Sequence, residues 1–288
     1  MILPVSHERL TARRWPIVTT VIFALCLAGQ AVVATSHGDP LRTWGYVPAD
    51  HAVLGLFTSP FVHAGWMHLA GNMWFLFFCG MTLEDRWGRL VFPLFYVAAG
   101  AASALLHGAL ASDPHVPLVG ASGAIAGCMG AFAVAFARTP VRFLWLLTLR
   151  PRTFSAPAWV DLPLWAVFEA ISGFIFPTDG TAHWAHVGGF AFGIVVGLVL
   201  HRTGWDQRLD DAVEVATVLG GDPRIDEAKR LARTGESEQA LAMMEGLAIE
   251  RPDSAVVHEA LAEVARAAGD ADRAARAETR AARLRANS

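Results

Sequence analysis

Six long apolar stretches dominate the first two hundred residues of the chain and constrain its fold more than any other feature. A helix that crosses the ~30 Å hydrocarbon core of a bilayer needs about 20 apolar residues. The stretches are 15–35, 66–83, 90–112, 116–137, 162–177 and 183–200. Only 17% of the residues are charged, whereas soluble domains carry about a quarter. We therefore predict an all-α polytopic membrane protein with a bundle of six transmembrane helices.

The arginines of the short loops predict the orientation, because positively charged loops stay on the cytoplasmic side. One side holds ten arginines and the other holds only Arg42. The ten are Arg9, Arg13, Arg14, Arg86, Arg89, Arg138, Arg142, Arg150, Arg152 and Arg202. We expect a multi-pass protein of the cell inner (plasma) membrane with both termini in the cytoplasm. The first stretch is too long for a cleaved signal peptide, so we expect it to remain as a helix.

Composition divides the chain into three parts: a cytoplasmic segment 1–14, a membrane domain 15–204 and a cytoplasmic helical tail 205–288. Within the tail, Gly235 and Gly269 interrupt amphipathic patterns 34 residues apart. That period is typical of tetratricopeptide repeats, which bind proteins, and it predicts a protein partner on the cytoplasmic side. Any two alanine-rich helical hairpins can show the same spacing, and only two units are present.

Several classes of ligand are not expected. The net charge of −3 indicates no nucleic-acid partner. Cys26, Cys79 and Cys128 lie in apolar stretches, where a thiol packs as a small hydrophobe. His63 and His68 are five residues apart, off a common helix face, and the chain has no H-E-x-x-H motif. We therefore predict no cofactor and no metal.

Polar residues inside membrane helices are costly, so they mark functional sites. His68 and Asn72 are four residues apart on one face of the second predicted helix. Ser122 lies six residues into the fourth predicted helix, and His186 lies in the first turn of the sixth. The even-numbered helices run in the same direction, so we expect these four side chains to share a layer near the outer surface.

Small residues indicate which helices approach closely. Gly189, Gly193 and Gly197 repeat every four residues, a spacing that lets another helix backbone come near. The fourth stretch carries its own set: Gly120, Gly123, Gly127 and Gly130. Packing the sixth helix on the fourth would bring His186 to Ser122.

A serine becomes a nucleophile when an adjacent base removes its proton, and histidine is the usual base. The Asn72 amide, the His68 ring and the Ser122 backbone N–H could then stabilise the oxyanion. No intramembrane aspartate is placed to orient His186, which favours a Ser–His dyad. We interpret Glu169 as a solitary acid that faces the bundle or a water pocket, with a proton relay as the alternative.

At these residues the chain resembles the rhomboid family of intramembrane serine proteases. The motif H-x-x-x-N spans His68 to Asn72, G-x-S-G spans Gly120 to Gly123, and A-H-x-x-G-x-x-x-G spans Ala185 to Gly193. Glu84 and Arg86 match the family's E-x-R signature. The likeness covers about 15–202, with six helices as in bacterial rhomboids, and does not include the tail.

The resemblance implies that Ser122 is the nucleophile and His186 the base. It assigns the oxyanion hole to Asn72, His68 and the Ser122 backbone N–H, and structural roles to Glu84, Arg86, Gly120, Gly123, Gly189 and Gly193. One departure is Ala126, which stands where many members carry an aromatic that stacks on the histidine. Trp184 or another aromatic is a candidate substitute.

The expected reaction is hydrolysis of a peptide bond in or beside the transmembrane helix of a single-pass or polytopic membrane protein. The resemblance also implies that the fifth helix borders the lateral entry for this substrate. An inactive rhomboid relative that binds membrane proteins for quality control or trafficking is the alternative, although such proteins typically lose the serine or the histidine. A transporter or channel that uses His107, Glu169 and the histidine cluster as a relay ranks last, because no inverted repeat relates the six stretches.

Overall fold

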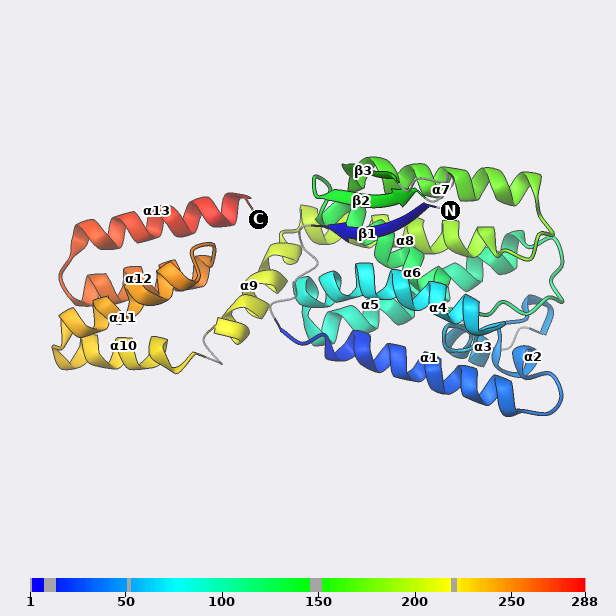
Figure 1. Cartoon of the computed structure of the whole chain (residues 1–288), viewed down its shortest axis with the longest axis horizontal. Coiled ribbons are helices and arrows are strands. Elements are labelled where there is room, and N and C mark those ends of the chain that lie inside the picture. The colour runs from blue at the N-terminus through cyan, green and yellow to red at the C-terminus, as the bar shows by residue number, and fades with distance from the viewer. Residues whose placement is uncertain (1, 8–13, 51–52, 146–151, 219–221, 288) are drawn as a thin grey trace. The chain divides into compact units, whose positions relative to one another are not determined.

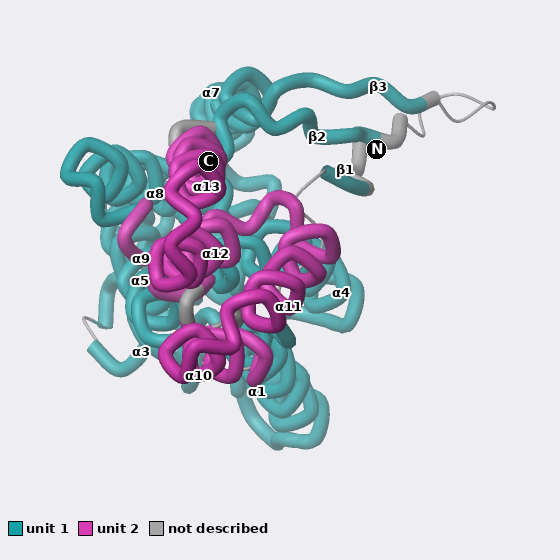
Figure 2. Tube along the Cα trace, turned by 90° about the vertical axis from the view of Figure 1, so that its left-hand side faces the viewer, with its two compact units in different colours: residues 1–206 teal, residues 207–288 magenta. Residues whose placement is uncertain are grey.

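The computed structural model describes residues 2–7, 14–50, 53–145, 152–218 and 222–287, and its secondary structure is predominantly helical (Figure 1). The chain forms two compact units, Met1–Asp206 and Gln207–Ser288 (Figure 2). The first unit holds the apolar stretches, and the second is the charged tail.

The helices of the first unit follow the apolar stretches. They are α1 (Ile17–Thr35), α2 (Pro40–Trp44), α3 (Val53–Thr58), α4 (Trp66–Phe75), α5 (Met81–Leu110), α6 (Ser122–Ala135), α7 (Ala158–Ile175) and α8 (His183–Arg202). Short 3-10 turns cover Pro48–Asp50 and Ser59–Phe61, and one π-helical turn, Leu76–Gly80, joins α4 to α5. Helix α9 (Trp205–Val218) starts at the end of this unit.

Four described helical stretches are long and apolar enough to cross a membrane, so the chain is a multi-pass membrane protein. They are Ile17–Thr35, Trp66–Leu110, Ala158–Ile175 and His183–Arg202. The second has 45 residues, which at 1.5 Å per residue is about 68 Å, long enough for two crossings. Gly88, with φ 81° and ψ 173°, breaks it near its middle. The apolar helix α6 has only 14 residues, so six crossings remains a prediction.

Helix α6 begins later than predicted. The expected helix over 116–137 is wrong at its start, because the helix begins at Ser122. The preceding segment is extended where the Leu118 backbone pairs with Tyr46, and Gly120 has φ 111°. Pro117 and a glycine in this conformation both oppose an earlier helical turn. Ser122 is therefore at the N-terminus of its helix rather than six residues inside it.

Helix α6 is buried on all sides, as expected for a helix that is apolar all round. Its glycines let α8 approach at backbone distance. A Cβ atom on Gly189 would overlap the carbonyl oxygen of Gly123, and one on Gly193 would overlap that of Gly127. The predicted packing of these two stretches is confirmed.

A small antiparallel sheet that the sequence analysis did not predict lies beside the helices (Figure 1). Its strands are β1 (Ile2–His7), β2 (Pro140–Trp145) and β3 (Arg152–Pro157), with β2 in the middle. The strands have six residues each, and β1 pairs with a strand more than 130 residues away in sequence. Such short segments carry little periodic signal, and β1 becomes a strand by pairing with β2.

The second unit contains α10 (Pro223–Thr234), α11 (Ser237–Glu250), α12 (Ala255–Ala267) and α13 (Ala271–Asn287). Gly235 and Gly269, both with positive φ, follow α10 and α12, so the predicted interruptions are confirmed. The core of this unit is aliphatic and includes Ile225, Met244, Leu247 and Val257.

Candidate active site

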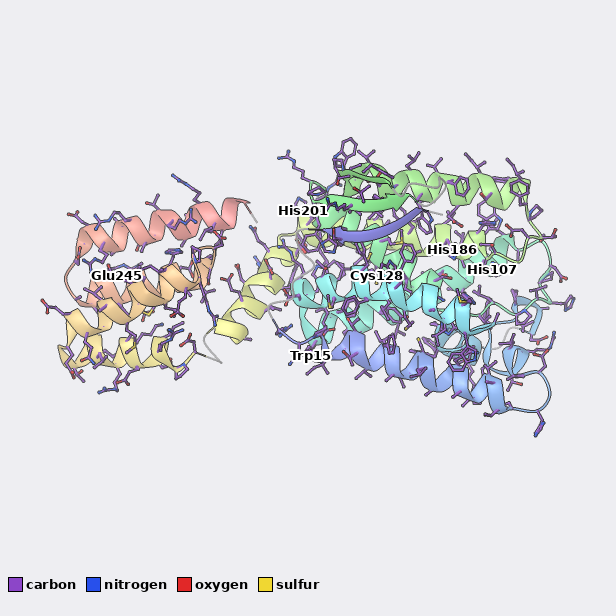
Figure 3. All side chains as sticks on the ribbon, in the orientation of Figure 1. Trp15, His107, Cys128, His186, His201 and Glu245 are labelled. Atoms are coloured by element: carbon purple, nitrogen blue, oxygen red, sulfur yellow. The ribbon has the colours of Figure 1, made fainter. Side chains whose placement is uncertain are left out.

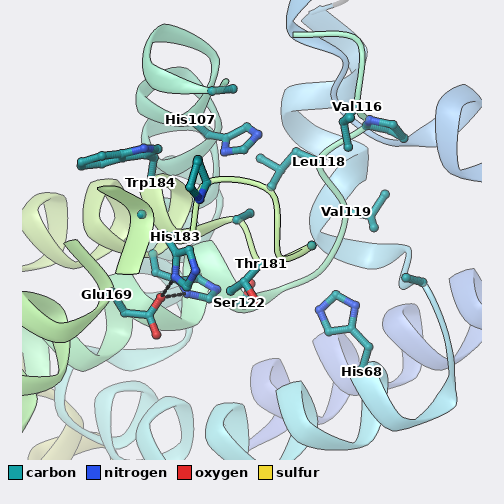
Figure 4. A pocket seen from close by; sticks show the side chains of 18 of the residues that line it. His68, His107, Val116, Leu118, Val119, Ser122, Glu169, Thr181, His183 and Trp184 are labelled. Carbon is teal, nitrogen blue, oxygen red and sulfur yellow. Dashed lines mark hydrogen bonds and ion pairs between the residues drawn. The ribbon is translucent and has the colours of Figure 1, made fainter. Parts of the chain in front are cut away.

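A cavity of about 1380 Å³ lies within the first unit and gathers the polar residues of the apolar helices. His68, Asn72, Ser122, Glu169 and His186 all line it. These residues come from α4, α6, α7 and α8, so the fold brings the predicted residues into one chamber. In Figure 4 Ser122 lies between Glu169 and His68.

The cavity lies toward one end of the helices. Figure 3 shows His186 and His107 toward the end opposite to Trp15 and His201. Trp15 precedes α1 and His201 is near the end of α8, so the two pairs mark different depths along the bundle. This placement fits a chemical site close to one membrane surface.

Gly120 presses the turn before Ser122 against α4. A Cβ atom on Gly120 would lie 2.7 Å from the His68 Cε1 and Nε2 atoms and 3.3 Å from the Asn72 Nδ2 atom. The Gly120 backbone N–H donates to the Ser59 carbonyl oxygen at 2.9 Å, which fixes the turn from the other side. Only glycine combines φ 111° with this close approach. The His68 ring and the Asn72 amide therefore contact the segment that carries Ser122.

Asn72 carries a buried polar group at the wall of the cavity. The residue is 7% exposed, and its Nδ2 atom has no hydrogen-bond partner among the described residues. An unsatisfied buried donor is costly, so its presence at a cavity suggests a ligand. Ser122 adds a backbone N–H in the first turn of α6, where N–H groups have no acceptor within their own helix. Both donors are suited to an anionic oxygen.

His63 is a structural residue that the sequence analysis had considered only as a metal ligand. It is fully buried, and its Nε2 atom accepts a hydrogen bond from the Ala121 backbone N–H at 3.4 Å. Burial, and secondarily the nearby His68, lowers the pKa of His63 to about 4, so the ring stays neutral and can accept. His63 thereby holds the residue immediately before Ser122.

His186 is held from α7. Its Nδ1 atom lies 2.8 Å from the Glu169 Oε2 atom, and the Trp165 ring centre lies 5.8 Å from the imidazole centre. Glu169 faces a cavity, in agreement with part of its interpretation, but it is not solitary, because its carboxylate contacts this imidazole. The two residues are 17 positions apart on different helices, so the contact is a product of tertiary packing.

Trp165 gives the His186 imidazole the aromatic neighbour that Ala126 does not supply. Trp184, which the sequence analysis named as a candidate, instead packs edge-on against Phe174 with ring centres 4.8 Å apart. Trp165 and Glu169 are four residues apart and so share one face of α7. That i, i+4 spacing of an aromatic and an acid is the signal that could have indicated this pair from the sequence.

Glu169 also contacts a second histidine. The His183 Nδ1 atom lies 2.8 Å from the same Oε2 atom (Figure 4). The His183 Nε2 atom lies 3.2 Å from Asp179 Oδ2. The three side chains Glu169, His183 and His186 have candidate metal-ligand atoms within 4.8 Å of one another. Zinc at bond lengths of about 2.0–2.1 Å would hold two ligand atoms about 3.3 Å apart in a tetrahedral site. Separations of 2.8 Å fit hydrogen bonds instead.

Ser122 and His186 line the same cavity on two helices in backbone contact, but within the described residues no hydrogen bond joins them. Ser122 comes one residue before Gly123, and His186 comes three before Gly189, whose backbones meet. Hydrogen bonds between a nucleophile and its base are often long in unliganded enzymes and tighten when substrate binds.

Glu84 and Arg86 lie outside the cavity and make buried contacts. The Glu84 carboxylate accepts hydrogen bonds from the Val18 and Thr19 backbone N–H groups at 3.0 and 2.8 Å, capping α1. The Arg86 guanidinium donates to Asp206 at 2.7 Å. Both contacts join helices that are far apart in the sequence.

Comparison with known proteins matches the part of the chain that contains the cavity residues. The Rhomboid domain matches residues 50–203, more than half of the chain. RHOMBOID-like protein 5 of Arabidopsis thaliana is 31% identical over 50% of this chain and 43% of its own length. Inactive RHOMBOID-like protein 8 of the same plant is 28% identical over 39% of this chain and 31% of its own length. Rhomboid-type serine protease 2 of Emericella nidulans is 25% identical over 54% of this chain and 28% of its own length. The chain thus spans less than half the length of these relatives.

Proposed function

The chain belongs to the rhomboid family, and on that premise we propose that it is an intramembrane serine endopeptidase with Ser122 as nucleophile and His186 as base. The observation that carries the proposal is the shared cavity, which is lined by Ser122 at the start of α6, by His186, and by Asn72, whose Nδ2 atom has no partner among the described residues. A serine protease among the relatives supports the same reaction class.

In the proposed reaction, His186 Nε2 takes the proton of the Ser122 hydroxyl as Oγ attacks the peptide carbonyl carbon. The negative charge on the carbonyl oxygen is stabilised by the Ser122 backbone N–H, the Asn72 amide and the His68 ring. Collapse of the tetrahedral intermediate breaks the C–N bond, and His186 returns the proton to the leaving amine. Water, activated by the same histidine, then hydrolyses the acyl-enzyme.

The substrates are membrane proteins, single-pass or polytopic, cut in or next to a transmembrane helix. A helical peptide bond is shielded by its own hydrogen bonds, so the substrate must unwind before attack. We expect small or helix-breaking residues near the cut. Helix α7 presents exposed apolar side chains suited to lipid or a substrate helix, including Leu164, Val167, Phe168, Ile171 and Phe174.

The proposed topology has six crossings in the plasma membrane with both termini in the cytoplasm. The excess of loop arginines supports the orientation. The tail, with its helices α10 to α13, is proposed to be a tetratricopeptide-like pair that binds a cytoplasmic protein; the 34-residue spacing of Gly235 and Gly269 supports this reading.

A second candidate function is a non-proteolytic membrane-protein binder. An inactive relative favours it, as does the lack, in the described part of the chain, of a hydrogen bond between Ser122 and His186. The presence of both residues in one cavity favours the protease.

Cleavage by purified protein in detergent separates the two. The wild type, Ser122→Ala and His186→Ala would be compared on a model substrate with one transmembrane helix, and Ser122 would be probed with a serine-reactive fluorophosphonate. Cleavage and labelling by the wild type alone would support the protease. If the wild type and both variants bind the substrate helix without cutting it, the protease proposal fails and the non-proteolytic function replaces it.

A further inference from the structure

The buried carboxylate of Glu169 lies beside the imidazole of His186, the proposed base. Glu169 is 8% exposed, and its Oε2 atom is 2.8 Å from the Nδ1 atom of His186. A carboxylate only accepts hydrogen bonds, so the Nδ1 atom must carry the proton in this contact. The Nε2 atom of a neutral His186 is then left with its lone pair, which is the form a general base needs.

We propose that Glu169 is a positioning residue that fixes the tautomer and direction of the His186 imidazole, so that the protein uses a Ser122–His186–Glu169 triad in place of a dyad. This inference rests on the proposed function. Trp165, one turn before Glu169, packs against the same imidazole and limits its rotation. One helix, α7, thus supplies both supports of the base.

The chemistry of the triad balances within these groups. When Ser122 Oγ attacks, its proton moves to His186 Nε2, and the imidazolium that forms keeps its Nδ1 proton on Glu169. Glu169 stays ionised and offsets the new positive charge; it does not take the proton. The proton then leaves from Nε2 to the amine of the broken peptide bond.

Other titratable groups around His186 define the controls. The cavity also holds His68 on α4, His107 on α5, Asp113 in the loop after α5 and His183 on α8. His183 shares the Glu169 carboxylate and meets Asp179 on its other nitrogen. Asp179→Asn therefore removes a carboxylate from His183 without touching His186, and it is the matched control.

The decisive variant is Glu169→Gln, because it keeps the size of the side chain and removes its charge. A glutamine amide can donate to Nδ1, which would place the imidazole proton on Nε2 and leave the base in the wrong tautomer. An equivalent change in a soluble serine protease lowers kcat by about 10⁴-fold. We expect a loss of kcat of about 10²–10⁴-fold with KM within twofold, and near-normal activity for Asp179→Asn.

The activity assay would be run with EDTA over pH 5–9 on a substrate with one transmembrane helix. Glu169→Asp should recover part of the lost kcat, since the charge is restored. Loss of the counter-charge should move the acid limb of kcat/KM in Glu169→Gln to lower pH, an effect that a purely structural residue would not produce. Wild-type kcat in Glu169→Gln would overturn the proposal.

A spectroscopic measurement tests the tautomer without activity. In protein with ¹⁵N-labelled histidine, the ring signals of His186, assigned through their loss in His186→Gln, should show a protonated Nδ1 in the wild type and a shift toward protonated Nε2 in Glu169→Gln. Protonated Nε2 in the wild type would overturn the inference. If the wild type neither cleaves nor reacts with fluorophosphonate, the proposed protease fails, and the ring signals still decide whether Glu169 sets the tautomer.

Discussion

The guanidinium of Arg86 and the carboxylate of Asp206 form a buried ion pair, with the Nη2 and Oδ2 atoms 2.7 Å apart and both side chains about 5% exposed. The Trp87 ring N–H donates to the same carboxylate at 2.8 Å. The pair joins the start of α5 to the start of α9. Removing one partner of a buried pair leaves an unpaired charge, which costs about 3–5 kcal/mol.

Arg86→Gln should therefore lower the free energy of unfolding by about 3–5 kcal/mol, measured by thermal or denaturant unfolding in detergent. The double variant Arg86→Gln with Asp206→Asn should recover part of the loss, since neither charge is then buried alone. Arg89→Gln is the control, because Arg89 is 40% exposed and should change stability by less than about 1 kcal/mol. Equal effects of Arg86→Gln and Arg89→Gln would contradict the assignment.

Gly120→Ala tests the turn before Ser122. An alanine at this position would have to adopt φ 111°, and its methyl carbon would lie 2.7 Å from the His68 ring. Both the backbone and the oxyanion donors would therefore have to move. We expect peptidase activity to fall by at least about tenfold, in line with the effect of an ångström-scale misplacement. Gly38→Ala is the matched control: Gly38 has φ 89°, but no atom lies within 4 Å of the added Cβ. Gly38→Ala should have the same backbone strain and keep its activity. Equal inactivation of Gly120→Ala and Gly38→Ala would contradict the proposed contact between Gly120 and the oxyanion donors.

Asn72→Ala separates catalysis from stability. Loss of one oxyanion donor typically costs about 10²–10³-fold in kcat. Because the Asn72 Nδ2 atom is buried without a partner in the described structure, its removal should change the melting temperature by only a few degrees. The measurement is kcat beside thermal unfolding of the same preparation. A large loss of stability with kcat preserved in the folded fraction would show that Asn72 is structural.

Trp165→Ala tests the aromatic support of the base. The variant would leave space beside the His186 ring, which lies 5.8 Å from the Trp165 ring centre, and we expect kcat/KM to fall by about tenfold through misorientation. Trp165→Phe should keep most of the activity because an aromatic face remains. Trp159→Ala, at an exposed tryptophan of the same helix, controls for surface changes on α7. Retained activity in Trp165→Ala would leave Glu169 as the sole support.

Hydropathy and glycine spacing predicted the elements that position Ser122 and His186, because apolar helix length and small-residue ridges are local properties of the sequence. The predicted start of α6 was too early: residues 116–121 are as apolar as a helix, yet Pro117, Gly120 and the pairing of Leu118 with Tyr46 keep them out of it. The strand β1 depends on a partner more than 130 residues away, which a local pattern does not show.

The contact between Glu169 and His186 was missed for a related reason. An isolated acid in an apolar helix has the same sequence pattern whether it faces lipid headgroups, a water pocket or an imidazole. The register of α7 against α8 decides between them, and that register is a property of packing. The donors around Ser122 were easier to predict, because His68 and Asn72 lie one turn apart on one helix face.

The neutral imidazole of His63 predicts how stability depends on pH. Burial holds the pKa of His63 at about 4 in the folded protein, against about 6.5 in an unfolded chain. Between these values the unfolded state binds more protons, so stability falls as pH drops from about 6.5 toward 4. From pH 7 to pH 5 the loss of unfolding free energy through this residue is about 2 kcal/mol.

His63→Gln, whose amide oxygen can still accept from the Ala121 N–H, should narrow the difference in melting temperature between pH 7 and pH 5. His115→Gln, at an exposed position in the loop after α5, should leave that difference as it is in the wild type. If both variants keep the wild-type dependence, the pH response comes from other groups.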